Sequence, residues 1–216
     1  MKRLFDILVS LAGLLLLQPF FVVIAILIKM DSAGPVFFRQ QRIGRNFTRF
    51  IIYKFRTMVV DAEKNGLRIT SRGDNRVTRV GRSLRKLKID ELPQLINVLK
   101  GEMSLVGPRP EVEEYVKLYE QDYTEILKSR PGITDVSSII FREEEVVLKN
   151  QIDPEWYYKK ILLPEKIRLS KEYTKNSSFL YDLKLVLTTI HKIFYPPAIR
   201  YNAYSQKMGQ NSFKEN

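Results

Sequence analysis

Two adjacent carboxylates, Asp90 and Glu91, are the residues of this 216-residue chain whose types and spacing are best suited to chemistry. They open a short helix predicted over residues 90–100. Backbone N–H groups and the positive end of that helix would keep Asp90 ionised, with help from Arg85 and Lys86. An ionised carboxylate can attack phosphorus or carbon, and its neighbour can bind a divalent cation or move a proton. The pair therefore indicates either a reactive site or, more plainly, a helix cap followed by a first-turn acid.

Basic residues elsewhere in the chain favour the reactive site. Lys54 is expected at the end of a strand, among aromatic side chains that could bury its stem, and Arg85 lies five residues before Asp90. Arg109 lies between two prolines, which restrict its backbone and could aim its guanidinium at a phosphate. Each of these residues taken alone is an ordinary solvated surface charge. Together they predict a site that handles a pyrophosphate, with a metal ion offsetting part of the charge.

The composition excludes several other chemistries. The chain has no Cys, which rules out disulfides, thiolate metal sites and cysteine nucleophiles. A single histidine, His191, rules out a multi-histidine zinc site and gives a histidine-based triad no support. The hydrophobic share of 44% excludes a wholly disordered chain, and the length predicts one compact domain, with or without an appendage.

The positive charge is concentrated in one stretch. The formal net charge is +12, and residues 39–88 hold 15 Lys and Arg against three acids, so the whole excess lies there. Such a stretch predicts a polyanionic partner, whose phosphates belong to a nucleotide, a nucleic acid or lipid headgroups.

A membrane segment is predicted near the N-terminus. Residues 7–28 carry no charge and, as a helix, would extend about 33 Å, enough to cross a hydrocarbon core of about 30 Å. The run is longer than the apolar part of a cleaved signal peptide, roughly 7–15 residues. Lys2 and Arg3 precede it and Lys29 follows it, so the positive-inside rule places both ends on the cytoplasmic side.

Pro19, preceded by Gln18, lies near the middle of this segment. Its ring removes a helix hydrogen bond and clashes with the preceding turn. A sharp kink there would return the chain to the face that it entered, as a re-entrant segment. A spanning helix that merely bends at Pro19 is the other possibility, and the residues alone leave both open.

The remaining patterns predict an α+β fold that is mostly helical with a small β-hairpin. The hairpin strands are expected at 35–42 and 49–55. An apolar stripe predicts a helix over 77–87, and residues 104–110 are expected to form a stiff turn. Further helices are predicted at 111–128, 154–173 and 179–194, the last of which is amphipathic and could lie in a membrane interface or pack in the core.

Three runs of this sequence resemble a known family. They are YKFRTM at 53–58, IDELPQLINVLKGEMSLVGPRP at 89–110 and PGIT at 131–134. They are similar to the motifs of the bacterial sugar transferases, which are small monotopic phosphoglycosyl transferases. The resemblance extends over about residues 1–190 in the family's order, and the second run is too long to match by chance.

The resemblance implies an activity and a set of site residues. The chain would transfer a phosphosugar from a UDP-sugar to a polyprenyl phosphate such as undecaprenyl phosphate, release UMP and require Mg²⁺. Asp90 matches the family's nucleophile, which forms a covalent phosphosugar-enzyme, and Glu91 matches the residue that binds metal or activates the lipid phosphate. The metal would thus lie at Asp90 and Glu91. The family's phosphate-binding and supporting positions fall on Lys54, Arg56, Arg85, Arg109 and Gln94.

The resemblance also implies a topology and a location. The family breaks its first segment at a Ser-Pro pair, which is Gln18-Pro19 here, so another group must replace the serine's hydrogen bond. The implied organisation is a re-entrant helix-break-helix anchor over 1–32, a catalytic domain over 33–200 and a polar tail over 201–216. The domain would lie on the cytoplasmic face of the bacterial inner membrane, in contact with its lipid and with no nucleic acid, at the first membrane step of a surface glycan pathway. The alternative is a membrane-tethered basic module that binds nucleic acid or anionic lipid without catalysis.

Overall fold

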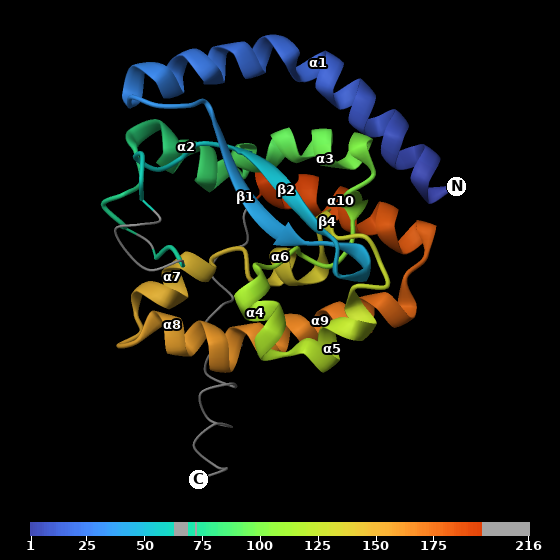
Figure 1. Ribbon diagram of the computed structural model, residues 1–216. Helices are drawn as coiled ribbons and strands as arrows, with labels where there is room; N and C mark the ends of the chain where they lie inside the picture. Colours follow the sequence, from blue (N-terminus) through green and yellow to red (C-terminus); the bar gives the residue numbers. More distant parts are fainter. Residues whose placement is uncertain (63–68, 72, 196–216) are drawn as a thin grey trace.

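A long N-terminal helix lies along one side of a domain built from short helices and two small sheets (Figure 1). The computed structural model describes residues 1–62, 69–71 and 73–195, so the predicted polar tail lies outside the described residues. Helix α1 (Lys2–Asp31) contains Pro19 and continues through it, and Figure 1 shows it as one curved ribbon. The structure therefore does not show the expected break of this helix at Gln18-Pro19.

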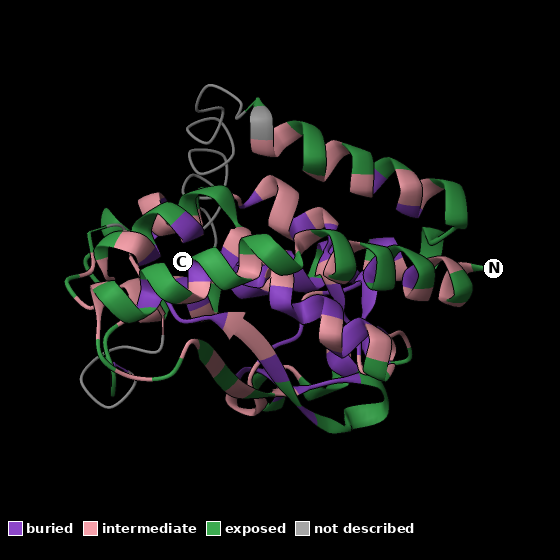
Figure 2. Cartoon of the chain, turned by 90° about the horizontal axis from the view of Figure 1, so that it is seen from above, coloured by how far each residue is buried: buried purple, intermediate pink, exposed green. Residues whose placement is uncertain are grey.

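The surface of α1 is mostly apolar and exposed. Among the described helices it is the one long and apolar enough to cross a membrane. Its buried residues are Asp6, Ser10, Ile24 and Ile28. Seen from above in Figure 2, the helix that starts at the N-terminus is coloured largely as exposed. An apolar face of this kind, left outside the protein core, suggests association with a membrane.

The N-terminal end of α1 is fixed to the domain by buried polar contacts. Lys2 Nζ lies 2.6 Å from Asp182 Oδ2, and Ser104 Oγ donates a hydrogen bond to Asp6 Oδ2 at 2.8 Å. These partners come from distant parts of the chain, so the start of α1 docks on the completed fold.

The C-terminal end of α1 is fixed to the same domain. The backbone N–H of Val80 donates to Asp31 Oδ2 at 2.8 Å, and Arg56 Nη2 donates to the carbonyl O of Ser32 at 2.7 Å. Both ends of the apolar helix therefore contact one body.

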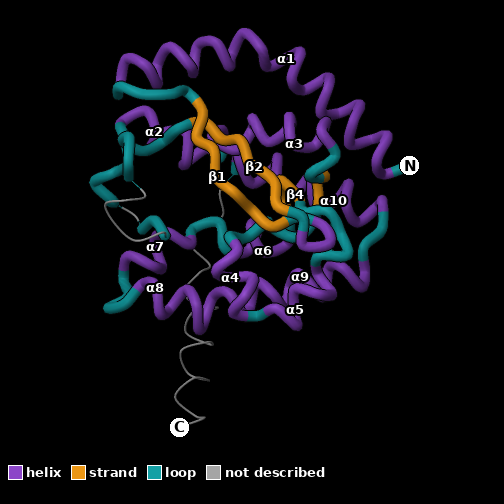
Figure 3. The backbone as a smooth tube through the Cα atoms, in the orientation of Figure 1, coloured by secondary structure: helices purple, strands orange, loops and turns teal. Residues whose placement is uncertain are grey.

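The predicted hairpin is confirmed. Strands β1 (Phe37–Ile43) and β2 (Arg49–Phe55) pair antiparallel, with Phe38 opposite Lys54 (Figure 3). The turn between them includes a short 3₁₀ segment, Arg45–Phe47, in which Asn46 and Phe47 have positive φ values of 52° and 59°. Asparagine tolerates this left-handed conformation better than most residues, which allows the tight reversal.

A second sheet, which the sequence patterns did not predict, lies within the domain. Strands β3 (Ser104–Val106) and β4 (Gly132–Thr134) pair in parallel. The chains approach so closely that a Cβ on Gly107 would be 2.3 Å from the carbonyl O of Arg130. Glycine is required at such a close backbone approach, and the contact fixes the chain that leads into Arg109.

The carboxylate pair follows helix α2. This helix (Arg79–Leu87) begins at Thr78, whose side chain accepts from Gly81 N, and ends at Lys88, which has a left-handed conformation. A 3₁₀ segment over Ile89–Gln94 and helix α3 (Leu95–Lys100) follow. The prediction of one helix that begins at Asp90 is therefore wrong at its start, because Lys88 is the N-cap and the chain first takes a 3₁₀ turn.

The rest of the domain is helical and forms the largest core cluster. Predicted helix 111–128 is two helices, because Tyr119 leaves the helical conformation, and predicted helix 154–173 includes a π-helical turn over Tyr158–Leu162. The elements are α4 (Glu113–Leu118), α5 (Glu120–Ile126), α6 (Val136–Ile140), α7 (Glu144–Lys149), α8 (Pro154–Tyr157), α9 (Leu163–Asn176) and α10 (Phe179–Phe194). The amphipathic helix α10 buries Leu185 in the core, which confirms core packing for that face, and it leaves Leu180 and Leu187 exposed.

Candidate active site

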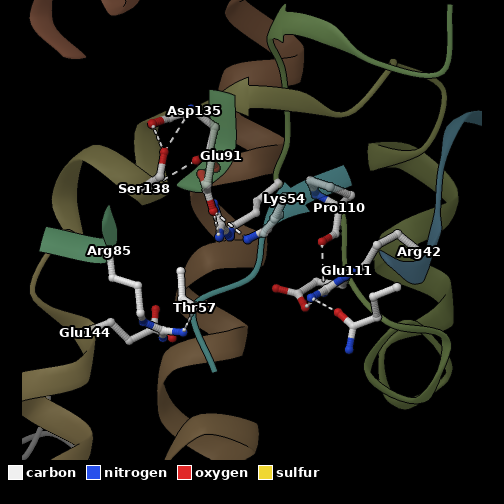
Figure 4. A network of polar contacts seen from close by, with 12 residues as sticks. Arg42, Lys54, Thr57, Arg85, Glu91, Pro110, Glu111, Asp135, Ser138 and Glu144 are labelled. Carbon is white, nitrogen blue, oxygen red and sulfur yellow. Dashed lines mark hydrogen bonds and ion pairs between the residues drawn. The ribbon is translucent and has the colours of Figure 1, made fainter. Parts of the chain in front are cut away.

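Glu91 is the centre of a buried cluster of ion pairs. Its Oε1 accepts hydrogen bonds from Lys54 Nζ at 2.7 Å and from Arg109 Nη2 at 2.7 Å. Figure 4 shows the Lys54 side chain meeting the Glu91 carboxylate. Burial alone would raise the pKa of Glu91, but the charges of Arg109 and Lys54 outweigh it and hold the pKa well below its ordinary value. Glu91 is therefore an anion that gathers two of the predicted phosphate-binding residues.

The two cations are positioned by different elements. Lys54 lies on β2 opposite Phe38, whereas Arg109 follows β3 between two prolines. Burial lowers the pKa of Lys54, although the Glu91 charge partly offsets this effect. The same Glu91 charge, acting against burial, raises the pKa of Arg109. Arg109 is thus a permanent cation, whereas the charged form of Lys54 is opposed by burial and favoured by Glu91.

Asp90 is buried, and one of its carboxylate oxygens is unpaired. The residue is 7% exposed, and its Oδ1 has no hydrogen-bond partner among the residues that the structure describes. Burial and the charge of Glu91 raise the pKa of Asp90, while Lys54 and Lys88 lower it without prevailing. The expectation that a helix N-cap holds Asp90 ionised is wrong, because Lys88 occupies that position. A buried, unpaired carboxylate oxygen is a mark of a functional site.

Two further predicted residues are engaged by protein groups. Arg85 pairs with Glu145 of α7, with Nε 3.0 Å from Oε1. The Arg56 guanidinium donates to the carbonyl oxygens of Ser32 and Ala33 at 2.7 and 2.5 Å, so it holds the chain that leaves α1. Gln94 is 2% exposed, and its Nε2 has no hydrogen-bond partner in the described part of the chain.

One cavity of about 830 Å³ unites these groups. Its lining includes six of the predicted residues, namely Lys54, Arg56, Arg85, Asp90, Glu91 and Arg109. The volume lies within the range of about 300–1,000 Å³ that small-molecule sites occupy.

The cavity also contains polar residues that sequence reasoning missed. Glu111 accepts a hydrogen bond from Tyr158 OH at 2.9 Å, and Arg42 Nη1 lies 3.4 Å from Glu111 Oε2 (Figure 4). Lys166 Nζ is paired with Glu144 Oε2 at 2.5 Å. No local spacing connects these residues, because they come from separate elements: Arg42 from β1, Tyr158 from the π-helical turn, and Glu144 and Lys166 from α7 and α9.

The carboxylate pair fits a divalent cation that takes most of its ligands from substrate phosphates and water. Among the described residues there is no group of three or more His, Asp or Glu side chains that could hold a metal alone. Asp90 Oδ1 has no hydrogen-bond partner among the described residues, whereas Glu91 Oε1 already accepts hydrogen bonds from two cations. Mg²⁺ commonly binds through one or two carboxylates together with substrate phosphates and water, and this pair suits that arrangement.

The fold and the site define a mostly helical protein with one long apolar helix and a cavity lined by adjacent carboxylates and several cations. The family model described as "Bacterial sugar transferase" matches residues 1–196, and the chain belongs to that family.

Relatives in other bacteria carry more specific names. The chain is 38% identical over 199 residues to the UDP-N-acetylgalactosamine-undecaprenyl-phosphate N-acetylgalactosaminephosphotransferase of Aeromonas hydrophila, over 89% of this chain and 43% of the relative. It is 40% identical over 198 residues to the undecaprenyl-phosphate glucose phosphotransferase of Komagataeibacter xylinus, over 88% and 35%. The chain thus spans less than half the length of these two relatives. It is 36% identical to the exopolysaccharide production protein ExoY of Rhizobium meliloti, over 88% and 83%.

Proposed function

We propose that this protein transfers a sugar 1-phosphate from a UDP-sugar to undecaprenyl phosphate, releases UMP and so begins the synthesis of an exopolysaccharide or other surface glycan. Two relatives are named for transfer to undecaprenyl phosphate, one of N-acetylgalactosamine phosphate and one of glucose phosphate. Because these relatives move different sugars, their names do not choose the sugar for this chain. The observation that carries the proposal is the buried, unpaired Asp90 oxygen beside the Glu91–Lys54–Arg109 cluster.

The reaction divides into two displacements. A carboxylate oxygen of Asp90 forms a bond to the sugar-linked phosphorus, the bond from phosphorus to the bridging oxygen breaks, and UMP leaves with that oxygen. An oxygen of the lipid phosphate then attacks the same phosphorus, and the Asp90 carboxylate leaves. Lys54 and Arg109, held by Glu91, stabilise the negative charge that gathers on the phosphoryl oxygens.

Mg²⁺ belongs to this proposal, and Asp90 and Glu91 are the residues that would hold it. It supplies charge neutralisation at the phosphates when bound. Arg85 completes the phosphate-binding set if substrate displaces Glu145 from its guanidinium. Arg56 supports the site through the chain that it holds, and the buried Gln94 supports it from beside the carboxylate pair, outside the cavity lining.

The topology that we propose is a re-entrant anchor with the cavity on the cytoplasmic face. Both ends of α1 contact the same domain, through Asp6 and Asp31 among others, which supports placing both ends on one side of the bilayer. The basic residues that flank the apolar run favour the cytoplasmic side.

The test is a panel of UDP-sugars assayed for UMP release with Mg²⁺ and undecaprenyl phosphate. Wild-type protein is expected to release UMP from at least one of them, and chelation of Mg²⁺ is expected to stop the release. Asp90→Asn is expected to reduce the rate by at least roughly 10³-fold, because the nucleophile is gone. Asp122→Asn is the matched control, since Asp122 pairs with Lys171 outside the cavity lining.

Three outcomes would contradict parts of this proposal. A fully active Asp90→Asn variant would remove the covalent route. Mass spectrometry of the enzyme with UDP-sugar alone is expected to show a phosphosugar adduct on Asp90, and a missing adduct would favour a single direct displacement. Protein that is inert towards every UDP-sugar, but binds oligonucleotides with a steep salt dependence, would favour the basic binding module.

A further inference from the structure

Part of the cavity lining is apolar. It includes Pro35, Val36, Phe38, Val59 and Val60, which we call the apolar mouth. Val59 and Val60 are 44% and 49% exposed. Single exposed apolar residues are ordinary, but two adjacent valines at the rim of a charged cavity form a surface suited to an apolar ligand.

The apolar mouth lies beside the C-terminal end of α1. Val60 packs against the turn that follows the helix, because a Cβ on Gly34 would be 2.5 Å from Val60 Cγ2. Pro35 is four residues after Asp31, so the two are at most roughly 14 Å apart. Figure 1 shows this short connection leading from the end of α1 directly into β1. The mouth therefore opens next to the exposed apolar helix, on the side where lipid would lie.

The same cavity is also lined by cations and by Asp90. Lys54, Arg85 and Arg109 line it together with the apolar mouth. A ligand that fills both parts must carry an anionic group at one end and a hydrocarbon chain at the other. A UDP-sugar has no hydrocarbon chain, whereas a polyprenyl phosphate has both parts.

We propose that the apolar mouth binds the first isoprene units of the polyprenyl phosphate acceptor, so that its phosphate reaches the cations around Asp90 while the rest of the chain stays in the bilayer. This inference rests on the proposed function and adds the place where the acceptor enters. The donor approaches the same phosphate-binding residues without touching the apolar mouth.

Photocrosslinking tests the binding site without requiring turnover. The probe is a polyprenyl phosphate with a diazirine on an isoprene unit next to the phosphate, used with the full chain in detergent micelles. Label is expected in the peptides that contain residues 35–38 and 58–60, and undecaprenyl phosphate should compete for it while phosphatidylglycerol does not. Label confined to α1, or equal competition by phosphatidylglycerol, would overturn the proposal.

Kinetics supply the second test. Val59→Asp and Val60→Asp are expected to raise the KM for undecaprenyl phosphate roughly tenfold or more and to leave the KM for UDP-sugar unchanged. Val60→Thr keeps the side-chain volume and should show the same selectivity with a smaller shift, which guards against misfolding of the aspartates. Leu118→Asp on α4 is the matched control, because Leu118 is an exposed apolar residue outside the cavity lining.

The two possible failures are distinguishable. Equal changes in both KM values, or no change in either, would overturn the acceptor site. A wild type that is specifically labelled at the mouth but releases no UMP would support the acceptor site and remove the proposed activity. A wild type that releases UMP but takes no label at the apolar mouth would overturn the acceptor site and support the proposed activity.

Discussion

The Asp90 carboxylate is buried beside Glu91, and both the burial and that neighbouring charge raise its pKa. Between the ordinary pKa of an aspartate and this raised value, the folded protein binds a proton that the unfolded chain has released. The stability of the folded state therefore falls as the pH rises through that window. Above that window an ionised Asp90 lowers the free energy of unfolding while it serves the chemistry.

We expect Asp90→Asn to raise the melting temperature at neutral pH, because the amide removes the buried charge. Each kcal/mol gained would shift the melting temperature by about 2–4 °C in a chain of this size. The difference between variant and wild type should shrink as the pH falls and Asp90 becomes protonated. Thermal unfolding of both proteins across a pH series measures this, and a less stable Asp90→Asn at neutral pH would contradict it.

At the scale of elements, two buried side chains of α1, those of Asp6 and Ser10, differ in the hydrogen bonds that they make to the domain. Asp6 accepts from Ser104 Oγ at 2.8 Å and from Leu105 N at 3.2 Å, whereas the buried Ser10 Oγ has no hydrogen-bond partner among the described residues. Removal of Asp6 leaves two buried donors unpaired, and removal of the Ser10 hydroxyl leaves none.

We therefore expect Asp6→Ala to lower the free energy of unfolding by about 1–3 kcal/mol and Ser10→Ala to leave it unchanged or raise it. The two substitutions are a matched pair, since both residues are buried on the same helix. Denaturant or thermal unfolding in one detergent compares them. Equal destabilisation by both variants would show that the polar contacts of Asp6 do not attach the helix.

The ends of α1 also allow a test of topology. The chain has no Cys, so single cysteines can be introduced without a background. Arg3→Cys and Pro35→Cys are expected to react with a membrane-impermeant maleimide from the same side of the membrane, because both ends of α1 contact one domain. Labelling from opposite sides would mean that the helix spans the bilayer.

Element prediction from the sequence succeeded where one local pattern decides the structure. The hairpin has two β-rich runs that form seven-residue strands, and α10 has an amphipathic pattern, so both were predicted. The 3₁₀ turn at Asp90 and the break at Tyr119 were missed, because periodicity does not distinguish 3₁₀ from α over a few residues. The three-residue strands β3 and β4 are too short to show alternation at all.

At the scale of the whole molecule, the predicted charge stretch and the apolar helix act together. Residues 39–88 hold the entire excess of +12, and α1 adds exposed apolar surface, including Leu15 and Leu16. Attraction to anionic lipid is screened by salt, whereas apolar insertion is not.

We expect binding to vesicles to increase with the content of anionic lipid and to fall only in part as salt is added. The residual binding in high salt should be lost in a Leu15→Asp/Leu16→Asp double variant, because those side chains are exposed on α1. Vesicle sedimentation measures both effects. Complete release of the wild type by salt alone would mean that the attachment is purely electrostatic.

The site itself could be predicted only in part from the sequence. Its chemical groups are close together along the chain, as at Asp90 and Glu91, or were supplied by the family resemblance. The partners that complete the cavity were not predictable, because Glu145 is 60 residues from Arg85 and Glu111 is 47 residues from Tyr158. Only the folding of α7 and the π-helical turn against the rest of the domain brings these pairs together.

The docking of Lys2 onto the last helices has a consequence for biosynthesis. Lys2 donates a hydrogen bond to Tyr173 OH, 171 residues further along the chain. At about 5–20 residues per second, a ribosome completes Tyr173 roughly 9–34 seconds after Lys2. Throughout that interval the apolar helix has no finished domain to rest on, so lipid is the surface available to cover it. The nascent chain is therefore expected to settle on the bilayer first and to assemble its phosphate-binding cavity there afterwards.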